Sequence, residues 1–367
     1  MSWPNRFLAG AAALAGLGAI SVAALAIGVV EAGGGAQLAG ANVLSAGPAT
    51  IIVAGPATPV TYQVSGAAQR EALTYWTAQR MLIAASSALP QVLGNAEQPP
   101  ATLSLATELR AQLAQAVGVA YIPPPPQGIP AATSFSGSPT TGALFSTVGH
   151  KARFCSAAVV DSTAGDLVLT AAHCVNNRKY FATHIAYVPD YNGGKLLYGE
   201  WPVRAITIAS GWQHSRNPNL DLAFLTVGPL NGQQIQARTG GLTLGFNQGY
   251  AQKMEVIAYD NAQDKPVRCA TKSFQFRPGQ MEFYCQGFSS GTSGAPWILG
   301  YNPKNGTGTM FGLIGGYKGG GSWQWASYSP YFSAAARALY ERAETVPTLS
   351  APGFVTHTYP PRLPQFH

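Results

Sequence analysis

Charged side chains are scarce in this sequence. Lys, Arg, Asp and Glu make up 10% of the 367 residues, whereas a soluble domain usually carries about a quarter. Residues 1–150 hold four basic and four acidic side chains, so the whole net charge of +7 belongs to residues 151–367, where the basic residues are scattered. This pattern excludes the dense basic stripe of a nucleic-acid-binding protein, and we expect no nucleic-acid partner.

Long apolar runs are also rare, and the one that occurs is at the N-terminus. Arg6 precedes an uncharged stretch over residues 7–30, and Val30-Glu31-Ala32 offers a small-residue cleavage site. The stretch exceeds the usual export signal of about 7–15 apolar residues and reaches the ~20 that span a bilayer, but it consists mostly of Ala and Gly. The sequence therefore predicts a signal peptide over 1–32, with a signal anchor tethering the chain to the membrane through residues 7–30 as the alternative. Both predict a location outside the cytoplasm, either secreted or at the outer face of the cell membrane.

Cysteine is absent from the first 150 residues. An even count in an exported chain favours disulfides, and four cysteines allow three pairings. The local pairings, Cys155–Cys174 and Cys269–Cys285, would each close a short loop between predicted neighbouring strands. No CxxC motif or His/Cys cluster at ligand spacing occurs, so we expect no metal and no cofactor.

Composition divides the rest of the chain. Residues 33–66 are rich in Gly, Ala and Pro and look linker-like, whereas residues 67–120 show two helical runs, the first broken by Pro90. Four prolines from Pro123 and a Gly/Ser/Thr stretch then predict a stiff and afterwards flexible connector. The predicted parts are a partly helical prosegment or stalk (33–122), a linker (123–141), a catalytic-type domain (142–344) and a Pro-rich tail (345–367).

From Gly142 onward, short β-type runs alternate with Gly, Pro and Asn turns. Many short strands with such turns predict an all-β sandwich or barrel, followed by one Ala-rich helix over residues 331–344. The expected strands are 167–171, 185–188, 203–208, 222–227, 254–259, 281–285 and 310–314.

Three motifs in this half could carry chemistry. His173 is expected to close a strand at "LTAAHC", Asp221 to open one at "LDLAFLTV", and Ser293 to lie in the loop "GFSSGTSGAPW". A serine needs a base to remove its proton as it attacks, a histidine can do so near neutral pH, and a carboxylate fixes the histidine tautomer. Glycines around Ser293 would let the amides of Gly291 and Ser293 form an oxyanion hole.

Each motif alone has an ordinary interpretation. A strand-end histidine, an aspartate before a strand and a Gly/Ser loop are usually structural. His214, in "GWQHSRNPN", is a rival base. The conjunction in His–Asp–Ser order, which is one of the known triad orders, favours His173, Asp221 and Ser293 as catalytic.

At these residues the chain resembles the chymotrypsin-like serine peptidases, over roughly Leu144 to Leu339. The wording around Tyr75–Met81 and the place of Cys285 are most similar to the bacterial secreted, trypsin-like branch related to glutamyl endopeptidases. The resemblance implies two perpendicular six-stranded antiparallel barrels with the triad between them. It also implies a Cys155–Cys174 bridge beneath His173.

The sequence departs from the family pattern beside the nucleophile. Thr292 stands where digestive relatives carry an aspartate that pairs with a freshly cut N-terminus, so maturation would act by unblocking the cleft. Gly287 takes the usual pocket-floor position, and the resemblance assigns the pocket wall to Gly315, Gly316 and Tyr317. None of these residues fixes the specificity.

Together these features predict an exported serine endopeptidase, made as a zymogen and monomeric, that hydrolyses protein or peptide substrates through an acyl-enzyme. The alternatives are a catalytically silent binding protein of the same fold, displayed at the cell surface, and a structural stalk.

Overall fold

The computed structural model describes residues 57–87, 123–149, 151–178, 180–260 and 265–347. The expected signal segment, the second helical run of the prosegment and the Pro-rich tail beyond Pro347 lie outside these residues. No helix within the described ranges is long and apolar enough to cross a membrane.

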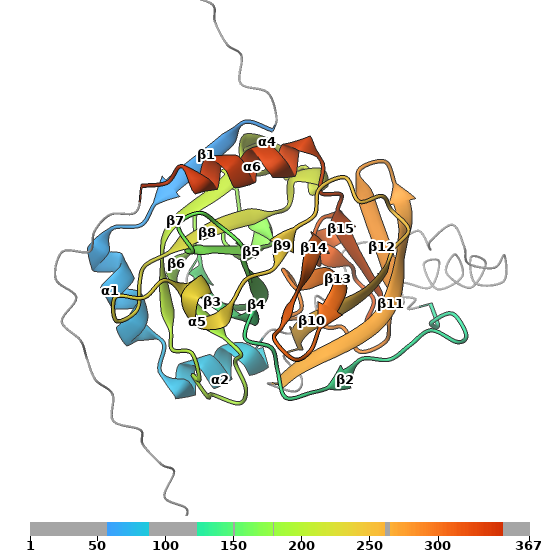
Figure 1. Cartoon of the computed structure of the whole chain (residues 1–367), viewed down its shortest axis with the longest axis horizontal. Helices are drawn as coiled ribbons and strands as arrows, with labels where there is room; N and C mark the ends of the chain where they lie inside the picture. Colours follow the sequence, from blue (N-terminus) through green and yellow to red (C-terminus); the bar gives the residue numbers. More distant parts are fainter. Residues whose placement is uncertain (1–56, 88–122, 150, 179, 261–264, 348–367) are drawn as a thin grey trace, which may run out of the picture. The chain divides into compact units, whose positions relative to one another are not determined.

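The first half of the fold is a closed antiparallel barrel (Figure 1). Its strands follow the order β7-β6-β3-β4-β5-β8, and a β7–β8 pairing closes the ring. A further strand, β1 (Pro59–Gln63), pairs with residues 205–209 of β7, beyond the part of β7 that pairs with β6. The barrel strands are β3 (Thr141–Val148), β4 (Lys151–Val160), β5 (Leu167–Thr170), β6 (Thr183–Pro189), β7 (Trp201–Ala209) and β8 (Ala223–Val227).

The second half is a curved antiparallel sheet with the order β15-β12-β11-β10-β13-β14. Beyond β14, the amide of Gly315 donates to the carbonyl of Tyr328 at 2.9 Å, which connects that end of the sheet to β15. Two two-residue strands flank it, β9 (Thr243–Leu244) on β14 and β2 (Thr133–Ser134) on β11. The six long strands are β10 (Lys253–Asp260), β11 (Lys265–Arg277), β12 (Gln280–Tyr284), β13 (Pro296–Asn302), β14 (Thr307–Leu313) and β15 (Ala326–Pro330).

Helices are few and peripheral. Ser65 caps the first helix by accepting the amide of Ala68, and Ser333 caps the last by accepting that of Ala335. Such capping satisfies amides that have no partner in the first helical turn. The helices are α1 (Gly66–Tyr75), α2 (Ala78–Ser87), α4 (Ser210–Ser215), α5 (Ile235–Thr239) and α6 (Ala334–Glu344), with short 3₁₀ turns η1 (Ala172–Cys174), η2 (Pro218–Leu220) and η3 (Tyr317–Gly320).

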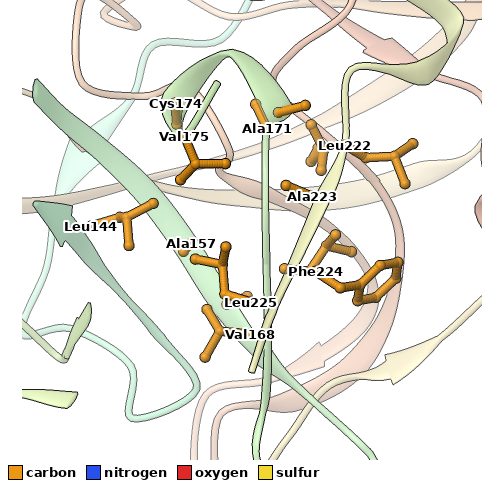
Figure 2. Close-up of a cluster of buried hydrophobic side chains, with 14 of the residues drawn as sticks. Leu144, Ala157, Val168, Ala171, Cys174, Val175, Leu222, Ala223, Phe224 and Leu225 are labelled. Atoms are coloured by element: carbon orange, nitrogen blue, oxygen red, sulfur yellow. The ribbon is translucent and has the colours of Figure 1, made fainter. Parts of the chain in front are cut away.

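Most strands are buried on both faces, which is why their sequences are continuous apolar runs and not an alternation of apolar and polar residues. All residues of β5 and β8 are buried, and Figure 2 shows their side chains, such as Val168 and Leu225, meeting Leu144 and Ala157 inside the first barrel. A separate cluster around Trp297 and Phe283 fills the second sheet. The expected all-β double-barrel architecture is confirmed.

The N-terminal side differs in places from what the sequence predicts. The sequence predicts a linker over 33–66, but Pro59–Gln63 within it forms β1, because its Val, Thr and Tyr residues find a partner strand in β7. The first helical run is interrupted at Trp76–Thr77, and Pro90, where the sequence predicts a break, lies outside the described residues. The predicted flexible linker also makes ordered contacts with the second sheet, including β2.

Two disulfides lie in the fold, Cys155–Cys174 and Cys269–Cys285. The first joins β4 to the η1 turn of the first barrel, and the second joins β11 to the end of β12. Together they form the local connectivity, one of the three that the sequence leaves open.

Candidate active site

His173 lies in the η1 turn that follows β5, and not at the strand end itself. Its backbone amide donates to Asp221 Oδ1 at 2.9 Å, and its ring Nδ1 lies 2.8 Å from Asp221 Oδ2. A carboxylate only accepts hydrogen bonds, so Nδ1 carries the proton. In the neutral ring, Nε2 is then left as an acceptor, which is the form a general base needs.

Asp221 is fully buried and follows the η2 turn. It lies two residues before β8 and does not open that strand. Besides the two His173 contacts, its Oδ2 accepts the amide of Gly316 at 2.8 Å. A buried carboxylate needs such donors to offset the loss of water. The three hydrogen bonds hold Asp221 and therefore the orientation of the His173 ring.

Ser293 lies in the loop between β12 and β13. Its carbonyl accepts the amide of Ser156 at 2.7 Å, and the next amide, that of Gly294, donates to Ile314 at 2.7 Å. Gly294 has φ +84°, and a Cβ there would lie 2.1 Å from the carbonyl oxygen of Ser156. Only glycine fits such a conformation and such a close approach, so Gly294 fixes how closely the serine loop packs on the first barrel.

Ser156 is a residue of the site that sequence reasoning missed. Its hydroxyl donates to the carbonyl of Gly291 at 3.0 Å and accepts the amide of Tyr259 at 2.8 Å. Together with its amide bond to Ser293, this buried side chain on β4 holds the loop that carries Gly291 and Ser293. The only sequence signal was a lone hydroxyl in an apolar run directly after Cys155.

The Ser293 hydroxyl and the His173 ring both border Gly319. Ser293 Oγ donates to the carbonyl oxygen of Gly319 at 3.5 Å. A Cβ built on Gly319 would lie 3.9 Å from Cε1 and 4.0 Å from Nε2 of His173. The η3 turn, in which Lys318 and Gly319 have positive φ values of 49° and 68°, thus lies beside both groups.

The expected pocket residues lie beside two parts of the segment from Gln324 to Tyr328. The amide of Gly315 donates to the carbonyl of Tyr328, whereas the amide of Gly287 donates to the carbonyl of Gln324 at 2.9 Å. Gly316 contacts Asp221, and the amide of Tyr317 donates to Gln280 Oε1 at 2.9 Å. The wall residues therefore lie beside the carboxylate, and Gly287 lies further along, with Ala132 of the N-terminal connector 3.5 Å from where its Cβ would be.

Aromatic and basic side chains surround Tyr317. Its ring packs edge-on against Tyr328, with 5.1 Å between centroids, and in a tilted arrangement against Phe276, with 5.0 Å between centroids. The Arg277 guanidinium lies 4.6 Å from the centre of the Tyr317 ring. This positions a cation at the border of the expected pocket wall.

Cys155, His173 and Cys174 place three possible ligand atoms within 4.8 Å of one another. Both sulfurs are engaged in the disulfide, which removes them as thiolate ligands. Within the described ranges, no other grouping of this kind occurs.

His214, the rival base, lies in α4, where its Nδ1 meets the carbonyl of Ser210 at 2.9 Å. This local contact within one short helix brings it no carboxylate partner comparable to Asp221. The geometry therefore favours His173 over His214.

Comparison with solved structures agrees with this arrangement. The chain is similar to the protease Anisep from Arthrobacter nicotinovorans, with 26% identity and a TM-score of 0.52 over 58% of this chain and 99% of the other. It is also similar to the thermostable serine protease AL20 from an extremophilic microorganism, with 25% identity and a TM-score of 0.52 over 57% of this chain and 99% of the other. The chain has a chymotrypsin-like serine protease fold. No protein-family model and no curated protein sequence matches it.

Within the chymotrypsin-like fold, the site draws on both halves. His173 and Asp221 belong to the first barrel, and Ser293 belongs to the second sheet. The matched region covers a little under three-fifths of the chain and nearly all of each neighbour, so this chain contains a substantial part that these two neighbours lack.

Proposed function

We propose that the protein is an exported serine endopeptidase whose catalytic residues are His173, Asp221 and Ser293. The observation that carries this proposal is the His173–Asp221 pair, with 2.8 Å between Nδ1 and Oδ2, beside the same turn that meets the Ser293 hydroxyl. The serine protease neighbours support the reaction class. The two disulfides support an oxidising location outside the cytoplasm.

In the proposed reaction, the Ser293 hydroxyl rotates from the Gly319 carbonyl toward His173 Nε2. Nε2 takes the proton as Oγ attacks the carbonyl carbon of the scissile peptide bond. The imidazolium that forms is stabilised by Asp221. The amides of Gly291 and Ser293 stabilise the oxyanion, a contribution in which one donor is typically worth about 10²–10³ in rate.

Collapse of this intermediate breaks the peptide bond. His173 gives its proton to the leaving nitrogen, and the acyl group stays on Ser293 Oγ. Water then loses a proton to His173 as it attacks the ester, the acid product leaves, and the proton returns to Oγ. The pocket wall is assigned to Gly315, Gly316 and Tyr317, with Gly287 at its floor, and the substrate is a protein or peptide.

Labelling with a fluorophosphonate probe tests the proposal, because such probes react with an activated serine. We expect labelling of the wild-type chain, loss of labelling in Ser293→Ala, and strong loss in His173→Ala. Ser322→Ala, which removes an exposed serine in the same half of the fold, is the matched control and should label normally. A folded wild-type protein that takes up no probe would identify a silent binding protein of this fold instead.

A further inference from the structure

Residues 57–87, which precede the domain expected over 142–344, pack against the first barrel. Strand β1 pairs antiparallel with β7 from Pro59 opposite Ala209 to Gln63 opposite Ala205. Backbone bonds continue the pairing at both ends, from Ser210 N to Thr58 O at 2.9 Å and from Val64 N to Arg204 O at 2.8 Å. The barrel sheet therefore extends into this segment (Figure 1).

The two helices after β1 bury apolar side chains on the outer face of the barrel. Met81 is fully buried and Trp76 is 4% exposed. They share one cluster with Phe145, Phe154 and Tyr191, and the Trp76 and Phe145 rings lie 5.4 Å apart. Without this segment, that aromatic face of the barrel would be open to water, which is unfavourable for so large an apolar surface.

His184 at the start of β6 adds directional contacts. Its ring stacks on Tyr75 at 4.1 Å between centroids, and its Nε2 lies 3.2 Å from Glu71 Oε1. Its backbone carbonyl accepts the indole N–H of Trp76. These directional contacts fix where α1 lies along the barrel, in addition to the apolar packing that holds it there.

The same segment has no disulfide to the rest of the fold, because all four cysteines pair with one another. After the undescribed stretch, the chain resumes on the other half of the molecule. There the carbonyl of Pro123 accepts the indole N–H of Trp325 at 3.0 Å, and that of Pro130 accepts the amide of Gln286 at 2.9 Å. Residues 57–87 are therefore held by the first barrel, and the connector from Pro123 is held separately by the second sheet.

We propose that the outer face of the first barrel is a docking surface whose permanent partner is residues 57–87 of the same chain. The protein then remains one noncovalent particle when the connection between Ser87 and Pro123 is cut. The contacts of this segment are with the barrel strands and the α6 side, and not with His173 or Ser293 in the described structure. Its role is to cover the outer face of the closed barrel, which differs from that of a prosegment that covers the cleft and leaves.

Controlled cutting tests the proposal independently of the proposed catalysis. Sites for a sequence-specific protease are inserted before Ala57 and between Thr102 and Leu103, in a Ser293→Ala chain that cannot digest itself. After cutting, size-exclusion chromatography at about 1 µM should show fragment 57–102 co-eluting with the remainder, and 6 M urea should separate them. Elution of the fragment apart from a folded remainder in native buffer would overturn the proposal.

Two neighbouring residues of α2 provide matched variants. Met81→Ala, combined with Trp76→Ala, should release the fragment at least tenfold faster than in the unsubstituted chain. Leu82→Ala, at a side chain that is 42% exposed, should leave its release unchanged. If the double variant does not fold, hydrogen exchange on the uncut chain decides the matter. We expect slow exchange at the paired amides of β1, and exchange at the rate of an unstructured peptide there would reject the docking.

Discussion

Asp221 Oδ2 accepts hydrogen bonds from His173 Nδ1 and Gly316 N, each at 2.8 Å. One carboxylate oxygen therefore connects the candidate base to the expected pocket wall. A buried acceptor with two donors holds both partners in place, so replacing Asp221 should disturb the orientation of His173 and the position of Gly316 together.

Asp221→Asn should lower kcat by about 10³–10⁴. The side-chain amide of the new asparagine has an N–H group where Asp221 has only acceptors. This N–H either faces the donors that Asp221 accepts or makes His173 Nδ1 the acceptor, which moves the proton to Nε2, so Nε2 no longer accepts the serine proton. Peptide hydrolysis and probe labelling measure this loss. Asp166→Asn is the contrast, because Asp166 is a buried aspartate that pairs with Arg204 at 2.6 Å. It should reduce stability while the folded protein keeps its kcat. Equal kcat losses in both variants would argue against a special role for Asp221.

Ser156→Ala should lower kcat by about 10–100-fold and leave KM nearly unchanged, because it loosens the serine loop and touches no substrate. It should also cost about 1–3 kcal/mol in stability, since the Tyr259 amide loses its buried acceptor. Ser273→Ala is a matched control. The Ser273 hydroxyl likewise donates to a carbonyl, that of Tyr250 at 2.7 Å, and accepts an amide, that of Gln252 at 3.2 Å, and neither partner belongs to the serine loop. A kcat loss of the same size in Ser273→Ala would remove the positioning role from Ser156.

Removing the two disulfides one at a time should lower the free energy of unfolding by similar amounts but lower kcat by different amounts. The bridged cysteines lie 19 and 16 residues apart, so loop closure predicts a similar loss of about 3 kcal/mol for each pair. Replacing Cys155 and Cys174 with alanine should also reduce kcat strongly, because these residues adjoin Ser156 and His173. Replacing Cys269 and Cys285 should affect kcat less. Urea unfolding and hydrolysis rates test this, and equal kcat losses would contradict it.

Glu200 should make stability depend on pH. Burial raises its pKa from 4.5 to about 8, and its Oε1 has no hydrogen-bond partner. The folded chain therefore keeps a proton that the unfolded chain has lost, so this contribution is full below pH 4.5 and declines as pH rises to about 8.

Glu200→Gln removes this proton, so its stability relative to wild type should rise between pH 5 and pH 8. The gain is at most about 1.4 kcal/mol for each unit of pKa shift, and solvent screening lowers it further because the side chain is only partly buried. Urea unfolding at both pH values measures it. Glu341→Gln, at an exposed position of α6, controls for the lost charge. Parallel pH curves for wild type and Glu200→Gln would contradict the prediction.

Much of the fold could be predicted from local patterns. The strands around Val168 and Leu225 are buried on both faces, so their sequences are continuous apolar runs. Such short runs between turn residues predict strands. The motifs single out His173, Asp221 and Ser293 as catalytic candidates, and the fold places the first two in and directly after 3₁₀ turns. A strand pattern does not show where its last residues change to a turn, because that depends on hydrogen bonds such as His173 N to Asp221 Oδ1.

Other features depend on partners that are distant in the sequence. Pro59–Gln63 has the composition of a linker and becomes a strand only because β7 offers an edge. Ser156 reads as an ordinary hydroxyl, and its role depends on Gly291, which lies 135 residues later. The connector after Pro123 is ordered by Trp325, about 200 positions away. No local window contains these pairs.

The candidate base and nucleophile are carried by different halves of the molecule, and the bonds of Ser156 join those halves beside them. Neither disulfide crosses this boundary. A slight slip of one half against the other would change the gap between imidazole and hydroxyl before any strand melts. On warming, hydrolysis should therefore fail at a lower temperature than the one at which the circular dichroism signal of the strands is lost.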